Sequence, residues 1–147
     1  MDDLLKTGVF YCSPTRDQYF KPMMVVHVGR LLRVKPEKKL FLDTFGYFIQ
    51  SIIDHMMIDG QLETWNVIVD VDQTSVFSFA GVLFDLIKFL SRIFIGRMYR
   101  CYIIDYPFFI KMIWGTVALM MDAEQNEKCR ILTKEEMIKL IPKEALE

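Results

Sequence analysis

The stretch that most constrains the fold of this chain is residues 99–121. Its first part is an apolar run ending at Asp105, which is typical of a buried strand, and Pro107 suits the first turn of a following helix. Residues 108–121 then place apolar side chains on every side of that helix, with Lys111 as its only charge. A surface helix normally shows a single apolar stripe. One face of this helix is therefore expected to meet something other than the protein's own core, and a lipid is the leading candidate.

A membrane span is the alternative explanation, and length excludes it. A helix over residues 108–121 is roughly 21 Å long, whereas the hydrocarbon core of a bilayer is about 30 Å thick. The apolar runs at 76–84 and 86–95 are interrupted by Asp85, Lys88 and Arg92. The chain starts with Met1, Asp2 and Asp3, and no apolar signal region follows. These features predict a cytoplasmic protein.

The amino-acid composition further limits which kinds of fold and function are possible. A chain of 147 residues is expected to form a single domain over residues 1–147. Its net charge of -1 argues against a nucleic-acid partner. Three cysteines, Cys12, Cys101 and Cys129, lack CxxC spacing and suit reduced, buried thiols. Ten methionines among 52% hydrophobic residues suit a cavity with variable contents, although methionine also fills ordinary core gaps.

The rest of the chain alternates strands and helices. Residues 4–17 carry turn residues and are interpreted as a loop with a short helix start. A strand is predicted at residues 23–28, closed by Gly29, and an amphipathic helix runs from Pro36 to near Gly60. The next predicted strand, residues 65–71, is apolar on both faces, as in a central parallel strand.

The second half continues the alternation. A helix with a wide apolar stripe is predicted from Ser75 or Ser78 through residue 94, and Gly96 ends it. The opening strand and apolar helix follow, then a short edge strand at residues 128–132. The last helix starts at Lys134, where Thr133 and Glu136 form a capping box. This order predicts an α/β fold with a mostly parallel sheet and crossover helices.

Four stretches of this pattern resemble the CRAL-TRIO lipid-binding domain family. They are residues 67–75, an apolar strand ending in Asp and a turn; residues 97–107, similar to the family's Arg-Met-Gly-Lys-Phe-Tyr-Ile-Ile-Asn-Ala-Pro; residues 114–132; and residues 8–31. The resemblance covers nearly the whole chain. It implies a sheet floor beneath helices that enclose an apolar lipid pocket, with a mobile gate helix at residues 108–121.

The resemblance also implies which residues contact the lipid. Floor and gate positions fall on Trp65, Val67, Cys101, Ile103, Ile110, Trp114, Val117 and Met121. Lys128 occupies the position of a headgroup-binding lysine. Phe94, Ile95 and Gly96 stand where phosphatidylinositol-binding members carry Tyr-Pro-Glu, so inositol lipid is half supported. Trp65 and Val67 stand where members that exchange phosphatidylcholine carry hydroxyls, which disfavours that lipid.

The resemblance implies a non-enzymatic lipid-transfer protein that binds a phospholipid, a phosphoinositide or another hydrophobic ligand and moves or presents it at membranes, associating with them peripherally. No catalytic residue, metal or cofactor is predicted. A protein-interaction scaffold with a filled or collapsed pocket is the alternative. Because the family's usual N-terminal helical lobe is missing, the chain is expected to be a homodimer or part of a longer protein.

Three other features of the sequence bear on function. Asp70, Asp72 and Thr74 match the DxDxT motif of Mg²⁺-dependent phosphatases, but no later strand ends in the Ser or Thr that this chemistry needs. A strand-end turn, in which Asp70 makes local hydrogen bonds, explains the motif better. His27 and His55 are interpreted as packed or surface residues. The basic segment between Gly29 and Leu40 reads as a solvated loop, or as a contact for anionic lipid headgroups.

Overall fold

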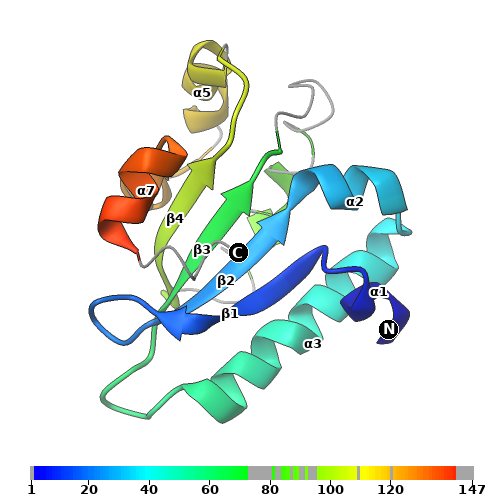
Figure 1. The fold of residues 1–147 in the computed structure, drawn as a ribbon, viewed down its shortest axis with the longest axis vertical. Helices are drawn as coiled ribbons and strands as arrows, with labels where there is room; N and C mark the ends of the chain where they lie inside the picture. Colours follow the sequence, from blue (N-terminus) through cyan, green and yellow to red (C-terminus); the bar gives the residue numbers. More distant parts are fainter. Residues whose placement is uncertain are drawn as a thin grey trace.

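The structure, a computed structural model, describes residues 2–72, 81, 84–86, 88–89, 92, 96–108, 110–119 and 121–141. Five strands form one sheet in the order β1-β2-β3-β4-β5 (Figure 1). The strands are β1 (Phe10–Arg16), β2 (Pro22–His27), β3 (Trp65–Asp70), β4 (Met98–Ile104) and β5 (Cys129–Ile131). β1 runs antiparallel to β2, and the other neighbouring pairs are parallel. The predicted α/β fold with a mostly parallel sheet is confirmed.

The described helices are α1 (Asp2–Lys6), α2 (Val28–Val34), α3 (Lys38–Met56), α5 (Ile110–Ala118), α6 (Ala123–Lys128) and α7 (Lys134–Leu140). Among them, α3, α5 and α7 correspond to predicted helices, whereas α2 and α6 were not predicted and α3 begins at Lys38 instead of Pro36. The helix predicted from residue 75 or 78 to residue 94 falls mostly outside the described residues, although Gly81, residues 84–86, 88–89 and Arg92 are helical. None of the helices in the described ranges has the length and apolar character that crossing a bilayer requires.

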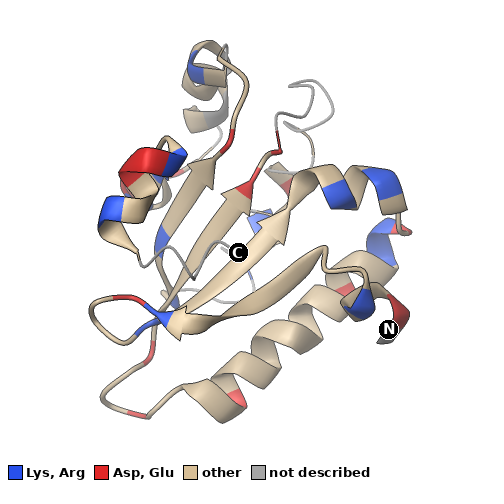
Figure 2. Cartoon of the chain, in the orientation of Figure 1, with Lys and Arg blue, Asp and Glu red and all other residues tan. Residues whose placement is uncertain are grey.

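Apolar side chains cover both faces of the sheet because strand residues alternate between them. On one face, the largest buried cluster joins β1 to β5 with α3, whose Phe41, Phe45 and Ile49 are buried. On the other face, Met23, Ile68 and further residues pack against Met137 of α7 and Ile141. Charged residues lie mainly on helices, loops and strand ends (Figure 2). The central strands are therefore covered on both sides, as predicted for β3.

The short helix start predicted within residues 4–17 corresponds to the end of α1, but the loop predicted for the rest of this stretch is wrong. Residues 10–16 form β1, an edge strand whose pairing with β2 shifts register between Cys12 and Arg16. Pro14 lies in this irregular part, and proline is tolerated on edge strands and at bulges. Pro14 and the turn residues Gly8 and Ser13 therefore made this segment look like a loop in the sequence. Its pairing with β2 identifies it as a strand.

Gly29 does not close the strand before it, and the basic segment is not simply a loop. β2 ends at His27 and continues directly into α2, in which Gly29 is buried. A side chain at position 29 would collide with Asp72, so glycine is required here by the close approach of that residue. Lys35 ends α2 in the left-handed conformation, and its N–H donates to the Leu31 carbonyl.

The C-terminal elements follow local capping signals. Thr133 and Glu136 form the predicted capping box at the start of α7. Sequence analysis missed α6, although Asp122 caps it by accepting a hydrogen bond from the Gln125 N–H over 2.8 Å. As a result, the edge strand predicted at residues 128–132 is shorter and spans only Cys129–Ile131.

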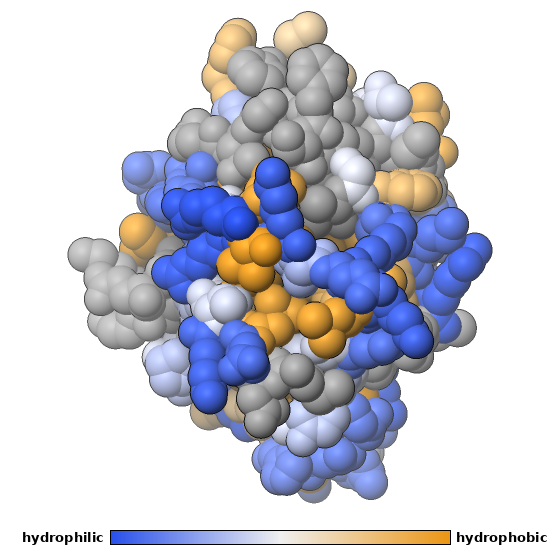
Figure 3. All heavy atoms as spheres, turned by 90° about the vertical axis from the view of Figure 1, so that its right-hand side faces the viewer, coloured by the Kyte–Doolittle hydropathy of each residue, from blue (hydrophilic) through white to orange (hydrophobic). Residues whose placement is uncertain are grey.

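A cleft of about 200 Å³ lies where α2 meets α3. It is lined by Leu31, Leu32, Lys35, Pro36, Lys38, Phe41, Leu42 and Asp85. Figure 3, which views this side of the molecule, shows a hydrophobic patch surrounded by hydrophilic side chains. The corner between α2 and α3 therefore combines an apolar hollow with a charged rim. We call it the α2–α3 cleft.

Candidate functional site

The four predicted floor residues lie side by side on one face of the sheet. Val67 of β3 pairs with Cys101 of β4, and Ile103 follows two residues later on the same strand. Because strand side chains alternate, Trp65 and Val67 face the same way, as do Cys101 and Ile103. All four are at most 2% exposed and belong to the cluster that packs against α3. These four residues thus form one continuous apolar surface beneath α3, and their role as a floor for lipid stays a prediction.

The floor continues across the sheet in register. Cys12 pairs with Met24, Met24 with Val67, and Cys101 with Cys129, so these residues form one row from β1 to β5. All three cysteines are free, as predicted, and Cys101 and Cys129 are buried. A hydrogen bond with Cys129 and burial raise the pKa of the Cys101 thiol well above its usual value. A neutral thiol of this kind behaves as a small apolar side chain.

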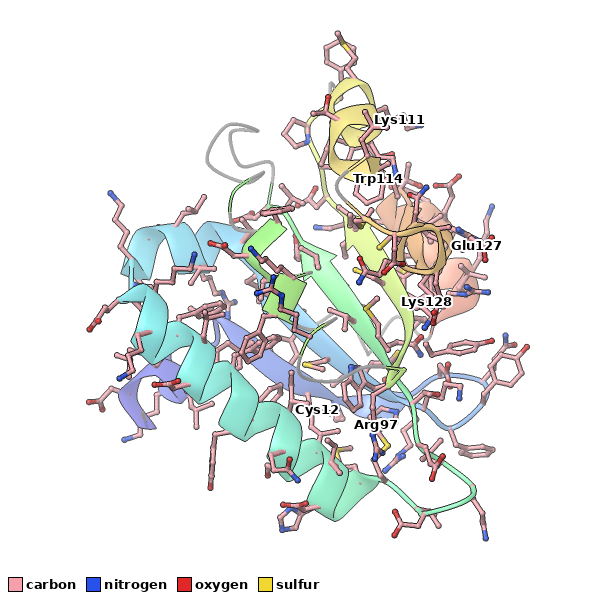
Figure 4. All side chains as sticks on the ribbon, turned by 180° about the vertical axis from the view of Figure 1, so that it is seen from behind. Cys12, Arg97, Lys111, Trp114, Glu127 and Lys128 are labelled. Carbon is pink, nitrogen blue, oxygen red and sulfur yellow. The ribbon has the colours of Figure 1, made fainter. Side chains whose placement is uncertain are left out.

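The apolar helix is attached to the floor by a few residues. Ile110 at its start and Met121 beyond its end are buried in the same cluster as the floor. Trp114 is partly buried and packs against that cluster. Figure 4 shows Trp114 on the side of α5 that faces the body of the protein. The side chain of Val117 lies outside the described residues. The helix itself is shorter than predicted, spanning Ile110–Ala118.

Other apolar residues of this segment are largely exposed. Phe108 is 87% exposed, Met112 78% and Leu119 87%. Figure 1 shows α5 projecting beyond the end of β4. An exposed apolar patch of this kind is expected to contact a partner or a membrane. The structure therefore leaves these apolar side chains exposed, and what they contact stays a prediction.

The position of the proposed headgroup lysine is now defined. Lys128 ends α6, next to the buried Cys129, and its Nζ lies 2.6 Å from Glu124 Oε1. The Lys128 side chain is 22% exposed, compared with 74% for Glu124. Figure 4 shows it on the same side of the molecule as Trp114, farther along the sheet. Phe94 and Ile95, at the Tyr-Pro-Glu position, lie outside the described residues.

The Asp70 motif makes the local contacts expected of a strand-end turn. Asp70 Oδ1 accepts a hydrogen bond from the Asp72 N–H over 3.0 Å, and His27 Nδ1 lies 3.3 Å from Asp70 Oδ2. The Asp72 carboxylate points elsewhere, 3.8 Å from the Arg33 guanidinium. Within the described ranges, His, Cys, Asp and Glu side chains form no group arranged to hold a metal ion.

His27 also packs against Tyr11, with ring centroids 5.6 Å apart. Sequence analysis did not predict the His27–Asp70 pair, since its members lie on different strands.

The His27–Asp70 pair gives a pH-dependent contribution to stability. Burial alone raises the pKa of Asp70, but the hydrogen bonds from His27 and Asp72 outweigh it, so the pKa is lowered on folding. The stabilisation is present above the unfolded aspartate pKa of about 4 and is lost as the pH falls through the lower folded value. Asp70→Asn and His27→Ala should therefore each reduce the acid-induced loss of unfolding free energy. Urea denaturation between about pH 5 and pH 2 measures this slope, and an unchanged slope in both variants would contradict the prediction.

A second cleft, of about 400 Å³, lies between the start of the α5 segment and α7. Asp105, Tyr106, Phe108, Thr133, Lys134 and Glu135 line it. Lys134 Nζ lies 3.1 Å from Asp105 Oδ2, which joins the end of β4 to the first turn of α7. No sequence signal links these two residues, because they are 29 positions apart. The loop before α5 is thus held to α7 by an ion pair.

Comparison with known proteins supports the architecture. No curated protein matches the chain. Among solved structures, the crystal structure of Sfh5 superimposes with a TM-score of 0.71 at 12% sequence identity. The match covers 90% of this chain and 50% of Sfh5, so the chain spans about half the length of that protein. Residues 5–147 match the CRAL/TRIO domain, which is nearly the whole sequence. The chain therefore belongs to the CRAL/TRIO domain family.

Proposed function

We propose that this chain binds a phospholipid or phosphoinositide against the sheet floor, with the α5 segment as a gate that opens at a membrane. Membership of the CRAL/TRIO family supports lipid binding in general. The observation that carries the proposal is the divided character of the α5 segment. Ile110 and Met121 are buried with the floor, while Phe108, Met112 and Leu119 are exposed. A helix of this kind can contact lipid with its outer side and close a pocket with its inner side.

The energetics favour a lipid with long acyl chains. Transfer of each CH₂ group from water to an apolar environment gains about 0.8 kcal/mol. The predicted floor offers Trp65, Val67, Cys101 and Ile103, and no charged side chain stands among these four. Selection would depend on the shape of the pocket, and Lys128 would favour an anionic headgroup. The chain would release its cargo when the exposed apolar residues of α5 enter a bilayer.

A scaffold with a filled pocket is the second candidate. It is favoured by the near-complete burial of the floor, because these side chains already have protein neighbours. Native mass spectrometry of the chain purified from cells separates the two proposals. A bound lipid adds its mass to the folded protein, whereas a filled pocket adds none. A protein that carries no lipid and takes up none from vesicles would refute lipid binding.

Lys128→Ala should selectively weaken the binding of anionic lipids. Removal of a charge-assisted contact to a phosphate is expected to lower their loading about tenfold. Loading of neutral lipids should change less than twofold, because their chains still bury the same apolar area. The protein is loaded from vesicles that contain anionic and neutral lipids, and native mass spectrometry measures how much of each lipid it binds. Lys139→Ala on α7 is the matched control. Equal losses for anionic and neutral lipids would contradict a headgroup role for Lys128.

A further inference from the structure

The corner between α2 and α3 concentrates positive charge. Residues 28–42 contain the cations Arg30, Arg33, Lys35, Lys38 and Lys39, with Glu37 as the only acid, in a chain whose net charge is -1. Figure 2 shows these cations along α2 and the start of α3. All five are exposed. This short segment carries an excess of four positive charges, which makes the corner strongly basic. The rest of the chain therefore carries an excess of acidic residues.

Most of this charge is available to an external partner. Lys38 Nζ lies 2.8 Å from Asp85 Oδ2, and Arg33 is 3.8 Å from Asp72. Arg30 donates to the Gly8 carbonyl. Lys35 and Lys39 make no ion pair within the described ranges of the chain. Exposed pairs such as that of Arg33 are weak and readily exchanged. The two lysines therefore offer ammonium groups that no described carboxylate neutralises.

The cations surround apolar surface. The apolar lining of the α2–α3 cleft includes Leu31, Leu32 and Phe41, and its charged lining consists of Lys35, Lys38 and Asp85, the last paired with Lys38. Val34 and Leu40 are exposed beside it. The cleft's volume of about 200 Å³ is smaller than the roughly 300–1,000 Å³ of sites that enclose a whole drug-sized ligand. It suits part of one acyl chain, with the ammonium groups placed to meet the phosphate above it.

Position in the fold connects this corner to α5. α2 follows the carboxyl end of β2, and α5 follows the carboxyl end of β4. β2, β3 and β4 are parallel, so both helices leave the sheet at the same edge (Figure 1). A bilayer at this edge would meet the apolar side chains of α5 and the cations of α2 and α3. Stable membrane attachment generally requires two such signals, an apolar insertion and a basic patch.

We propose that the α2–α3 cleft and its basic rim form a docking surface for the anionic phospholipids of a membrane, with Lys35 and Lys39 as its main electrostatic contacts. The inference rests on the proposed function, since α5 provides the apolar contact at the same membrane. Charge complementarity favours an anionic lipid surface: positive residues near such a surface each strengthen binding, and the effect decays with increasing salt.

Co-sedimentation with vesicles tests this docking surface. The chain is mixed with phosphatidylcholine vesicles containing 30 mol% phosphatidylserine, or with phosphatidylcholine alone. Lys35→Gln and Lys39→Gln should each weaken binding to the anionic vesicles about fivefold, and the double variant more than tenfold. Lys139→Gln on α7, which removes the same charge elsewhere, should change binding less than twofold. Surface substitutions of this kind leave stability nearly unchanged, and circular dichroism verifies the fold.

The outcomes distinguish this inference from lipid binding itself. The double variant should retain the wild-type amount of bound lipid in native mass spectrometry, because neither lysine lines the floor. Absence of wild-type binding to anionic vesicles, or equal binding by the double variant, overturns the docking surface while lipid loading still stands. In that case an acidic protein segment becomes the better occupant of the cleft. Charge-dependent vesicle binding without any bound lipid would retain the docking surface and reject the proposed function.

Discussion

Trp114→Asp is expected to abolish lipid loading while the fold persists. Trp114 packs against the floor cluster from α5 and is only partly buried. A carboxylate at this position would face the proposed ligand, and an unpaired charge in an apolar environment costs several kcal/mol. The residues that attach the segment, Ile110 and Met121, are unchanged and remain buried. We therefore expect loading to fall at least tenfold, as measured by native mass spectrometry.

Two further variants make this result specific. Thr116→Asp places the same charge on an exposed position of α5 and should load lipid like the wild type. Trp114→Ala removes the side chain without adding a charge and should reduce loading less than Trp114→Asp does. Circular dichroism and thermal unfolding report whether each variant is folded. Wild-type loading by folded Trp114→Asp would show that α5 does not close the pocket.

Phe45→Ala should lower the free energy of unfolding by about 3–5 kcal/mol. Phe45 is fully buried on α3, and its ring contacts Phe10, Phe41 and Phe48 with centroid distances of 5.2, 5.8 and 6.4 Å. Truncation leaves a cavity where the helix meets the sheet. The loss is a large share of the roughly 5–15 kcal/mol that stabilises a typical domain.

Urea denaturation of Phe45→Ala and a control measures this effect. Tyr47→Ala lies two residues away on α3, but its side chain is 60% exposed and should change stability by at most about 0.5 kcal/mol. The difference between the changes in unfolding free energy of the two variants measures the packing of Phe45 against the sheet, because both substitutions change helix propensity in a similar way. A cost below about 1 kcal/mol for Phe45→Ala would mean that α3 is not held to the sheet by this aromatic cluster.

The candidate floor could be predicted because it depends on alternation within each strand. Alternation places Trp65 with Val67 on one face of β3 and Cys101 with Ile103 on one face of β4, and the register decides whether the two faces coincide. The resemblance to the CRAL-TRIO family supplied the floor residues, and the observed register places Val67 and Cys101 opposite each other. The apolar character of residues 108–121 was equally plain in the sequence. Their exposure was expected because a single short domain cannot cover a helix that is apolar on every side.

The features that were missed depend on contacts between distant segments. β1 exists because residues 10–16 pair with β2, and Pro14 argued against a strand in that region. The His27–Asp70 pair joins two strands separated by α2 and α3. The Asp105–Lys134 pair links the loop before α5 to α7. None of these contacts leaves a local pattern, since each joins residues that are far apart in the sequence or on different strands.

The sequence by itself determined the alternation of strands and helices, the apolar run after Pro107 and the capping box at Thr133. These follow from side-chain periodicity and local hydrogen bonding, which act over a few residues. Only the tertiary structure decided that the basic segment continues from β2 as α2, and that an apolar cleft opens between α2 and α3. The reason is physical: a cleft, an edge strand or an ion pair between strands forms where distant segments meet, and their positions depend on how the whole chain packs.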